Sequence, residues 1–417
     1  MHRSIGWPTC GLFVLATFWP TTIQAAGLPQ DHPWQIVLRG YLQTMTPDSV
    51  KIGKAVCKVL AACVCLSACG DTPVDADHYA PRSLLTARAG TADEEIKTAG
   101  DWPKRRKQIL DAMQQVMGPL PEATKLPLDV KILAEERTPK FVRQSIEYTS
   151  EVNNHTGKAE RVPAFLFLPA DLKPGEKRPA ILALHPTSPL GKASITGAGK
   201  PNRQYGLELA ERGYVVICPD YPSFGDYAKD FANSPHPSGT MQGIVNHRRA
   251  VDLLVSLPQV DSDRIAAIGH SLGGHNALFI AAFDPRIRAC VTSCGWNLFP
   301  DYYNGDLTGW TSDRYMPRIK TVYEKSAARL PFDFHEVIAA IAPRAVLSIS
   351  PTQDSNFAVA GVRKAVPSIG AVYALHGAAK AFQVEYPECG HDFPPQMRTR
   401  AYAFIDDALR APVRGRD

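Results

Sequence analysis

The 417-residue sequence has no long basic tract interleaved with aromatic residues. Proteins that bind nucleic acid usually carry such a tract, so the sequence gives no reason to expect a nucleic-acid partner. The formal net charge is only +5, and the first 69 residues hold five Lys or Arg against two Asp, which leaves +2 for the remainder. A hydrophobic content of 45% and a charged content of 21% indicate an ordinary globular protein, long enough for one large domain with extensions.

The common metal and nucleotide motifs are also missing. His335-Glu336 begins like the zinc-binding H-E-x-x-H helix, but Ala339 stands where the second histidine belongs. Gly199-Lys200 resembles the end of a phosphate-binding loop, but Pro201 replaces the required Ser or Thr. No G-x-G-x-x-G follows an apolar strand in the right setting. The sequence therefore indicates neither a zinc helix nor a nucleotide cofactor.

Two short apolar runs near the N-terminus are typical of export signals. Residues 11–19 precede Ala25-Ala26, as in a secretory signal peptide. The second run, from Val59 to Cys69, follows three lysines that come after Met45, and it is too short to span a hydrocarbon layer of about 30 Å. It ends in Leu66-Ser67-Ala68-Cys69, which resembles the bacterial lipobox, whose cysteine is lipidated.

We therefore expect Met45 to be the true start, residues 1–44 to be an over-extended gene model, and Cys69 to carry a lipid anchor to a membrane. An ordinary cleaved signal, or a buried helix containing Cys63, Cys65 and Cys69, is the alternative. In either case we expect the protein to be exported, as a lipoprotein of the bacterial cell envelope or as a periplasmic or secreted protein.

Four cysteines follow this region, namely Cys218, Cys290, Cys294 and Cys389. Export permits disulfides. Cys290 and Cys294 are four residues apart in an expected strand, about 13 Å at ~3.3 Å per residue, which is too far for a bond between them. Cys294 and Cys389 both lie at carboxyl ends of expected strands, so a disulfide between them and two buried free thiols both stay open.

The chain is expected to divide into three parts: a targeting region at 1–69, a tether or lead-in at 70–100, and one main domain at 101–417. Pro81 and Gly90, among many Asp and Ala, suggest poor order in the lead-in. A helix is predicted from Trp102 to Met117, where the apolar spacing is helical and Gly118-Pro119 ends it.

Two kinds of strand follow this helix. Residues 128–133, 141–148 and 162–168 are predicted to be antiparallel strands at a sheet edge. Further along, short and continuously apolar runs alternate with segments of helix length. Such strands belong to a parallel sheet that helices cover on both faces. The sequence therefore predicts an α/β fold with a mostly parallel central sheet and an antiparallel N-terminal edge. The six runs are 180–184, 214–217, 264–268, 287–292, 345–349 and 381–386.

One interval, at 295–340, is longer than a simple connection and rich in aromatic residues, which argues against disorder. Trp296 and Trp310 lie in it, and Tyr221 and Phe224 follow another strand end. Because aromatic rings combine a flat apolar face with a polar edge, these four side chains are candidates for the wall of a substrate pocket. Ordinary packing of the aromatic interval onto the core is the competing interpretation.

A G-x-S-x-G motif lies directly after the apolar run that ends at Ile268. In Gly269-His270-Ser271-Leu272-Gly273 the glycines relieve crowding where a strand turns at once into a helix, and the serine is exposed at the apex. This nucleophile elbow is a short pattern that also occurs by chance, so its context has to decide. A serine hydroxyl needs a base to take its proton, and the base needs an acid to orient it.

Both partners occur where this fold would place them, each just after a later strand. Asp354 follows the run 345–349, and His391 follows the last run. We therefore predict Ser271, Asp354 and His391 as a catalytic triad, with Glu388 and Asp392 as reserve acids. A turn aspartate and a plain surface or core histidine are the alternatives for the two partners.

An oxyanion requires two backbone N–H donors fixed in advance. The amide of Leu272, directly after the nucleophile, is one candidate. The second is expected in the loop after Leu184, where Pro186 has no N–H, so Thr187 is predicted. His185 is expected to brace this loop through its ring or to line the pocket.

With these residues in place, the chain resembles the α/β-hydrolases, and more narrowly the dienelactone-hydrolase and acetyl-xylan-esterase-like bacterial enzymes. The resemblance covers about residues 100–410. It implies an ester hydrolase without metal or organic cofactor, acting on acylated plant polysaccharide or its oligomers. A serine peptidase and a non-catalytic, lipid-anchored binding protein are the alternatives. The stretches that carry the resemblance are 184–187, 210–226, 269–275, 342–344 and 389–394.

Overall fold

The computed structural model describes residues 81–89, 92–122 and 125–410, all within one compact unit, Pro73–Asp417. The targeting region at 1–69 and the lipidation candidate Cys69 lie outside the described residues, so both stay predictions. Among the helices that the structure describes, none combines the length and the apolar character needed to cross a bilayer.

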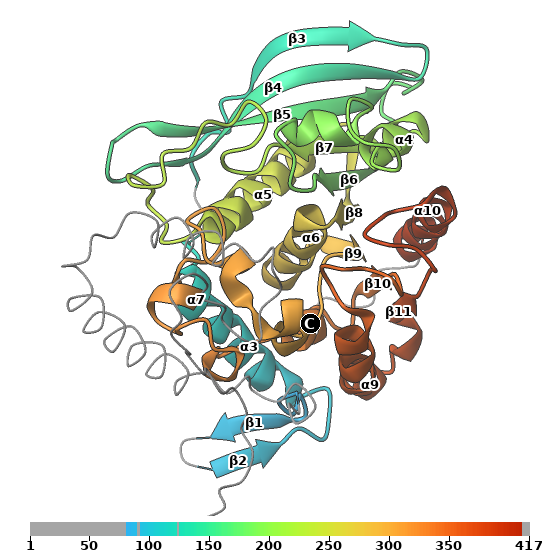
Figure 1. Cartoon of the computed structure of the whole chain (residues 1–417). Helices are drawn as coiled ribbons and strands as arrows, with labels where there is room; N and C mark the ends of the chain where they lie inside the picture. Colours follow the sequence, from blue (N-terminus) through green and yellow to red (C-terminus); the bar gives the residue numbers. More distant parts are fainter. Residues whose placement is uncertain (1–80, 90–91, 123–124, 411–417) are drawn as a thin grey trace, which may run out of the picture. The chain divides into compact units, whose positions relative to one another are not determined.

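The core of the unit is a nine-stranded sheet in the order β11-β10-β9-β8-β6-β7-β5-β4-β3 (Figure 1). Strands β6 to β11 run parallel to one another, whereas β3, β4 and β5 are antiparallel and form one edge. The predicted fold class, with its antiparallel N-terminal edge, is confirmed. The strands are β3 Lys131–Arg137, β4 Phe141–Val152, β5 Ala159–Pro169, β6 Arg178–Leu184, β7 Val215–Pro219, β8 Val260–His270, β9 Ile287–Ser293, β10 Ala345–Ile349 and β11 Phe382–Glu385.

Helices cover both faces of the sheet because successive strand residues point to opposite faces. Along β6, Ala180 and Leu182 pack in a cluster with helices α3, α5, α6, α8 and α9, whereas Ile181 and Ala183 pack in a second cluster with α4 and α10. Figure 1 shows α4 and α10 on the side of the sheet away from α5 and α6. Each fully buried Leu or Ile contributes roughly 1.5–3 kcal/mol. The helices are α3 Trp102–Met117, α4 Tyr205–Glu211, α5 Gly239–Ser256, α6 Leu272–Phe283, α7 Arg318–Thr321, α8 Phe334–Ala339, α9 Val359–Leu375 and α10 Pro395–Arg410.

The aromatic interval after β9 is a compact excursion of short helices, including α7 and α8. Phe299, Trp310 and Phe334 contact one another at centroid distances of 5.3–6.0 Å and lie 1–3% exposed. The prediction that this interval is ordered is confirmed. Its rings build a core of their own, which keeps a long connection in place over the sheet.

The expected tether is wrong for the described part of the lead-in. Residues Thr86–Ala89 (β1) and Ala92–Glu95 (β2) form an antiparallel hairpin. Leu84, Ala87 and Ile96 are at most 3% exposed and belong to the same apolar cluster as α3. The composition suggested a tether because the segment holds few apolar residues, and their partners are distant in sequence.

A buried ionic cluster joins the lead-in, α3 and α8. The carboxylate of Glu336 is 1% exposed and pairs with Arg82 at 2.8 Å and with Arg105 at 2.5 Å. It also accepts the backbone N–H of Asp333 as part of a capping box at the start of α8. Burial alone would raise the pKa of Glu336, but the charges of Arg82 and His335 and the hydrogen bond from Arg82 outweigh it, so the pKa lies below its usual value.

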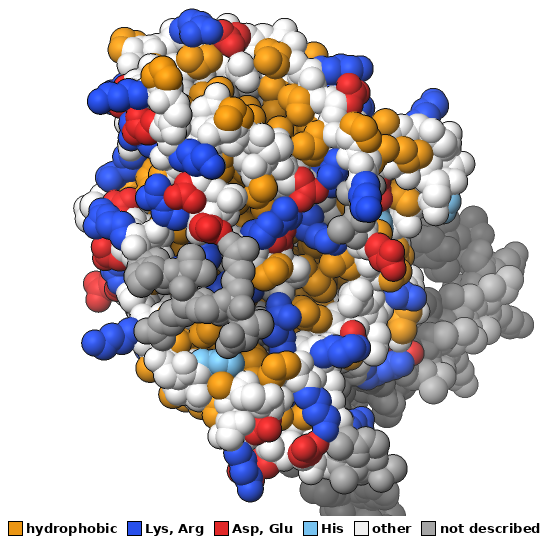
Figure 2. Space-filling view, turned by 180° about the vertical axis from the view of Figure 1, so that it is seen from behind, with side chains coloured by type: hydrophobic (Ala, Val, Ile, Leu, Met, Phe, Trp, Pro, Cys, Tyr) orange, Lys and Arg blue, Asp and Glu red, His pale blue; other side chains and the backbone are white. Residues whose placement is uncertain are grey.

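Figure 2 shows the opposite face of the molecule from that in Figure 1. Lys and Arg side chains are interspersed there with Asp and Glu, and hydrophobic side chains occur between them. Such a mixture is usual for a water-facing surface, which retains much apolar area.

We predict that Glu336→Ala lowers the free energy of unfolding by about 3–5 kcal/mol, because Arg105 would keep a buried charge without its carboxylate. The measurement is urea unfolding followed by circular dichroism. The effect should shrink as pH falls through the lowered pKa of Glu336, since only the ionised carboxylate is stabilised.

Glu94→Ala is the matched control. Glu94 pairs with Lys104 of the same helix α3, but both side chains are about half exposed, at 57% and 46%. An exposed pair contributes at most ~1 kcal/mol. Equal destabilisation by the two substitutions would contradict a special role for the buried cluster.

Candidate active site

Ser271 occupies a sharp turn between β8, which ends at His270, and α6, which begins at Leu272. Its backbone has φ 56° and ψ −119°, which is unusual for a residue with a side chain. A Cβ on Gly269 would lie 2.1 Å from the carbonyl oxygen of Gly273, and one on Gly273 would lie 1.9 Å from that of Leu184. The prediction that these glycines relieve crowding at the turn is therefore confirmed.

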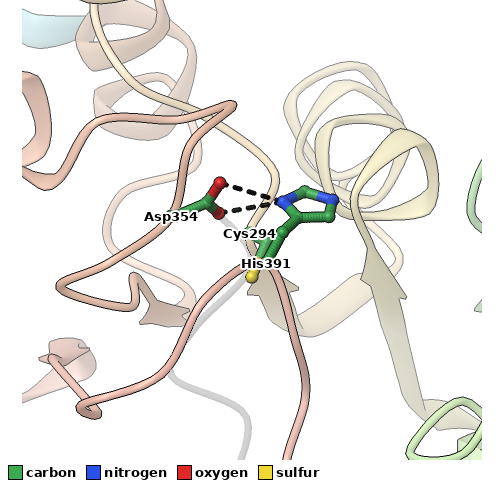
Figure 3. A group of neighbouring side chains, drawn as sticks. All are labelled: Cys294, Asp354 and His391. Carbon is green, nitrogen blue, oxygen red and sulfur yellow. Dashed lines mark hydrogen bonds and ion pairs between the residues drawn. The ribbon is translucent and has the colours of Figure 1, made fainter.

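Asp354 and His391 are hydrogen-bonded to each other (Figure 3). Asp354 lies in the loop after β10 and His391 in the loop after β11, so the parallel sheet brings them to the same edge. His391 Nδ1 lies 3.0 Å from each oxygen of Asp354. An ionised carboxylate can only accept, so Nδ1 donates, and Nε2 of the neutral ring is left without a proton. This tautomer suits a general base.

The carboxylate of Asp354 is held in its charged form. Its side chain is 0% exposed, and burial alone would raise its pKa. The hydrogen bond from His391, together with those from the amides of Phe357 and Asn356, outweighs burial, so the pKa lies below its usual value. Those two amides donate to Oδ1 at 3.1 and 2.8 Å. Asp354 therefore stays ionised at neutral pH.

The residue before the serine contacts His391. The ring of His270 lies 4.9 Å from that of His391, centroid to centroid. Both Ser271 and His391 are partly exposed, so substrate can reach them. Among the described residues there is no hydrogen bond from the Ser271 hydroxyl to His391, and in free enzymes such contacts often tighten only when substrate binds.

The reserve acids are placed elsewhere. The carboxylate of Asp392 pairs with Arg203 and accepts a hydrogen bond from Asn202 at 2.8 Å. Glu388 is exposed. Neither carboxylate hydrogen-bonds the ring of His391 among the described contacts, so Asp354 is the acid that the geometry favours.

The two predicted oxyanion donors come from different parts of the fold. Leu272 is the first residue of α6, so its N–H has no carbonyl partner within the helix. Thr187 lies in the loop after β6, and its hydroxyl is 3.2 Å from that of Tyr315, which comes from the aromatic excursion. Among the described residues no atom accepts a hydrogen bond from the amide of Thr187. Both amides thus remain candidates to bind an oxyanion.

His185 braces the loop after β6, residues 185–190, which carries Thr187 and is called the oxyanion loop below. Its Nε2 accepts the N–H of Tyr221 at 2.9 Å, so its Nδ1 carries the proton and donates to the carbonyl oxygen of Pro186 at 2.7 Å. Burial lowers the pKa of His185 and keeps the ring neutral. At 2% exposure it has little surface for substrate. The expected brace is confirmed, and the expectation that His185 lines a pocket is wrong.

Tyr221 and Phe224 form a small cluster with Leu272, against which Tyr315 packs. The cluster is therefore next to the proposed nucleophile. The guanidinium of Arg314 lies 4.4 Å above the ring of Phe224, and the Tyr221 hydroxyl donates to the carbonyl oxygen of Arg314 at 2.7 Å. Tyr221 and Phe224 are only 3% and 7% exposed, so little of either ring is open to a substrate.

The two tryptophan candidates belong to the core. Trp296 is 1% exposed and donates from Nε1 to the hydroxyl of Ser348 at 2.8 Å. Trp310 is 3% exposed and packs against Tyr302, Tyr315 and Phe357. The prediction that the two tryptophans line a pocket wall is wrong, because packing of the excursion buries both. Tyr302 and Tyr315 also belong to the excursion and are partly exposed, so they are better candidates for contact with a substrate.

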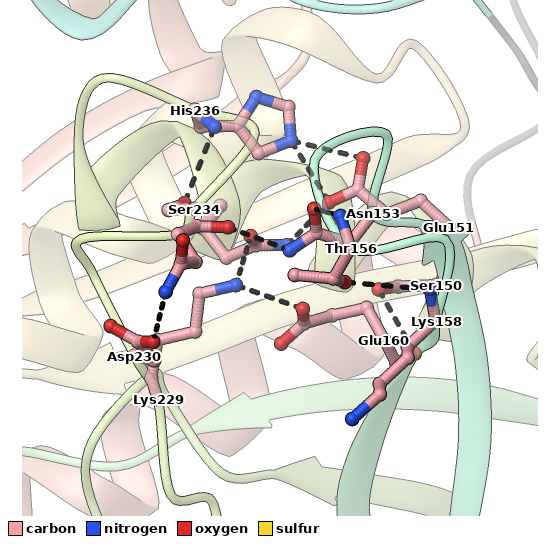
Figure 4. A network of polar contacts seen from close by, with 12 residues as sticks. Ser150, Glu151, Asn153, Thr156, Lys158, Glu160, Lys229, Asp230, Ser234 and His236 are labelled. Carbon is pink, nitrogen blue, oxygen red and sulfur yellow. Dashed lines mark hydrogen bonds and ion pairs between the residues drawn. The ribbon is translucent and has the colours of Figure 1, made fainter.

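A polar network anchors the loop that carries Tyr221 and Phe224 (Figure 4). Lys229 donates to Glu160 at 2.9 Å and to Gln242 at 2.8 Å, while His236 contacts both oxygens of Glu151 at 3.0 Å. These bonds tie the loop after β7 to β4, β5 and α5. The second half of this loop is thus held in place.

A second buried ion pair fixes the oxyanion loop and was not found from the sequence. Asp220, 0% exposed, accepts hydrogen bonds from the backbone N–H and the ammonium of Lys192 at 2.7 and 2.6 Å. A Cβ on Gly191 would lie 2.1 Å from the carboxylate, and one on Gly225 would lie 2.3 Å from it. Asp220 lies within the stretch 210–226 that carried the resemblance, which is the sequence signal that contained it.

The cysteines at this edge are free thiols. Cys294, directly after β9, is 2% exposed, and Cys389 is partly exposed. Of the two possibilities that the sequence left open, the structure has the free thiols. The Sγ of Cys294 lies 3.3 Å from the carbonyl oxygen of Asp392, beside the Asp354–His391 pair.

An α/β sheet with an elbow serine and an acid–histidine pair at its carboxyl edge defines a hydrolase class of fold. The chain belongs to the alpha/beta hydrolase family, whose model matches residues 196–406. A putative hydrolase of Bacillus subtilis, YtaP, is 30% identical over 322 residues, which cover 73% of this chain and 99% of YtaP.

Solved structures share the fold at lower identity. A glucuronoyl esterase from Solibacter usitatus has a TM-score of 0.64 at 18% identity, covering 80% of this chain and 98% of that one. A putative acetyl xylan esterase from Bacteroides fragilis has a TM-score of 0.53 at 17% identity, covering 75% of this chain and 80% of that one. Both share the overall fold of this chain.

We predict that Asp354→Asn lowers kcat by about 10³–10⁴-fold with little change in KM. An amide at this position would offer His391 a donor as well as an acceptor and would no longer fix the ring tautomer. The measurement is steady-state hydrolysis of p-nitrophenyl acetate.

Asp392→Asn is the matched control, because it alters a neighbouring carboxylate that pairs with Arg203 instead of the ring of His391. Its kcat should stay within about tenfold of the wild-type value. A large loss from Asp392→Asn together with a small loss from Asp354→Asn would show that the acid is misassigned.

Proposed function

We propose that the protein is a serine carboxylic-ester hydrolase. The observation that carries this proposal is the Asp354–His391 hydrogen bond, formed at the sheet edge where the strained turn presents Ser271. A buried, ionised acid that fixes the tautomer of a partly exposed histidine has a clear chemical use beside an elbow serine.

The proposed reaction has two halves. The Ser271 hydroxyl attacks the ester carbonyl while Nε2 of His391 takes its proton, and the amides of Leu272 and Thr187 stabilise the oxyanion. His391 then protonates the departing alcohol and leaves an acyl-serine. In the second half, His391 takes a proton from water, the resulting hydroxide attacks the acyl group, and Ser271 recovers its proton as the acid leaves.

The substrate class is proposed from two features. The structural neighbours are described as glucuronoyl and acetyl xylan esterases, enzymes of carbohydrate esters. The partly exposed Tyr302 and Tyr315 beside the site offer flat faces of the kind on which sugar rings stack. We propose that the enzyme deacylates plant polysaccharide or its oligomers, without metal or organic cofactor, and that it works outside the cytoplasm.

Ser271→Ala should abolish hydrolysis of p-nitrophenyl acetate, leaving less than about 10⁻³ of the wild-type kcat/KM. The wild-type enzyme should also be labelled covalently by a fluorophosphonate, with the adduct on Ser271 located by mass spectrometry. Retained turnover in the variant would refute the assignment of the nucleophile. An unlabelled wild-type protein without turnover would instead favour a non-catalytic binding protein.

The substrate class is checked by a panel of acetylated xylan, aryl esters, feruloyl esters and peptides. We expect the acetylated polysaccharide to have the highest kcat/KM and peptides to be cleaved at least about a hundredfold more slowly. Preferential cleavage of peptides would overturn the esterase assignment in favour of a peptidase of the same fold.

A further inference from the structure

Cys294 places a third metal-ligating side chain against the Asp354–His391 pair (Figure 3). The thiol sulfur, a carboxylate oxygen and a ring nitrogen of these three residues all lie within 4.8 Å of one another. Each side chain follows a different strand, β9, β10 or β11. No local spacing motif therefore marks the cluster in the sequence.

The backbone at Cys294 indicates that the thiol has a specific position. Its φ is 48°, in the left-handed region where glycine is the ordinary residue. Its N–H donates to the carbonyl oxygen of Ile349 at 2.9 Å, which ties the end of β9 to the end of β10. A side chain at such a position is strained by about 1–2 kcal/mol. The fold nevertheless holds a buried sulfur next to the acid–base pair.

We propose that Cys294, Asp354 and His391 form a binding site for a thiophilic divalent cation such as Zn²⁺, and that the bound cation stops catalysis. The inhibitory part rests on the proposed function, whereas the binding itself does not. Cysteine, histidine and carboxylate are the ligands that Zn²⁺ prefers, and three protein ligands with an open fourth position are a common arrangement.

The geometry is close to that of a zinc site. Ligand atoms about 2.0–2.3 Å from a tetrahedral zinc are roughly 3.3–3.7 Å apart. The ring nitrogen and the carboxylate oxygens are 3.0 Å apart, and all three ligand atoms lie within 4.8 Å, so shifts of about 1 Å suffice. Oδ1 of Asp354 can keep its two amide donors while Oδ2 binds the cation. The His391 side chain is 23% exposed and gives access from solvent.

The proton balance explains why binding would inhibit. A cation on Nδ1 of neutral His391 requires the ring proton to move to Nε2, so that nitrogen can no longer accept the proton of Ser271. The thiol of Cys294 releases one proton to solvent as its sulfur binds the metal. Burial and the charge of Asp354 raise the pKa of this thiol, so without metal it stays protonated. With the cation bound, His391 is a metal ligand and can no longer act as the general base.

Inhibition by added cations tests the proposal. We expect Zn²⁺ to inhibit p-nitrophenyl acetate hydrolysis by the full-length protein at micromolar concentrations, and Mg²⁺ to have no effect at a hundredfold higher concentration. Cys294→Ser should raise the half-inhibiting Zn²⁺ concentration at least about tenfold. Cys389→Ser, which changes the neighbouring partly exposed thiol outside the trio, should leave it unchanged. Equal inhibition of the wild type and Cys294→Ser would overturn the proposal.

Binding is measured separately with Cd²⁺, whose thiolate complexes absorb in the ultraviolet. The absorbance difference between wild type and Cys294→Ser should show one such complex, and Ser271→Ala should retain it. Absence of the difference overturns the site even if the enzyme is active. If Cd²⁺ binds while Zn²⁺ leaves turnover intact, the inhibitory role is overturned. An inactive wild type would contradict the proposed function and leave the Cd²⁺ result readable.

Cys294→Ala provides the second variant. Should Cys294→Ser unfold because a hydroxyl fits the buried position poorly, the smaller apolar side chain removes the ligand without adding a polar group. Circular dichroism checks the fold of both variants. A folded Cys294→Ala enzyme with wild-type sensitivity to Zn²⁺ would equally overturn the proposal.

Discussion

The close contact between the first turn of α6 and the strands β6 and β8 is the constraint on which the site depends. A single methyl group on Gly273 would overlap the carbonyl oxygen of Leu184, and one on Gly269 would overlap that of Gly273. Tyr205 reinforces this point, because its hydroxyl donates to Leu184 at 2.5 Å and accepts from the N–H of His270 at 3.3 Å. The continuously buried strands offset the strain at Ser271, because their buried aliphatic side chains, at roughly 1.5–3 kcal/mol each, together contribute more than the ~1–3 kcal/mol that the turn costs.

The parallel sheet was predictable because its strands are buried on both faces and therefore apolar without interruption. β10 was predicted with its observed bounds, Ala345–Ile349. The antiparallel edge of the sheet was harder to predict, because its outer strand is polar. β3 was expected at 128–133 and lies at Lys131–Arg137, where every residue is exposed and Glu135 and Glu136 pair with Gln144 and Arg143 of β4. Backbone hydrogen bonds to the neighbouring strand stabilise such a strand. Its exposed side chains do not alternate between apolar and polar, so the sequence gives no pattern that would mark its bounds.

In the candidate site, too, some features could be predicted from the sequence and others could not. That Asp354 and His391 lie together could be predicted, because residues that directly follow parallel strands lie at the carboxyl edge of the sheet. Trp296 was wrongly predicted to line a pocket, because an aromatic ring suits a pocket wall and a core equally well. The path of the excursion determines whether the ring is buried, and the local sequence does not show that path. The contact of Tyr315 with Thr187 joins residues 128 positions apart, so no local pattern encodes it.

The surroundings of Asp354 illustrate why a thiol is tolerated beside a buried carboxylate. A second negative charge there would oppose the first in a region of low exposure, and the acid would lose the ionised form that orients His391. Burial and the charge of Asp354 raise the pKa of Cys294, so its sulfur stays protonated and adds no charge. The protonated thiol therefore leaves the Asp354–His391 pair intact, whereas a cation that takes the place of its proton would recruit all three groups.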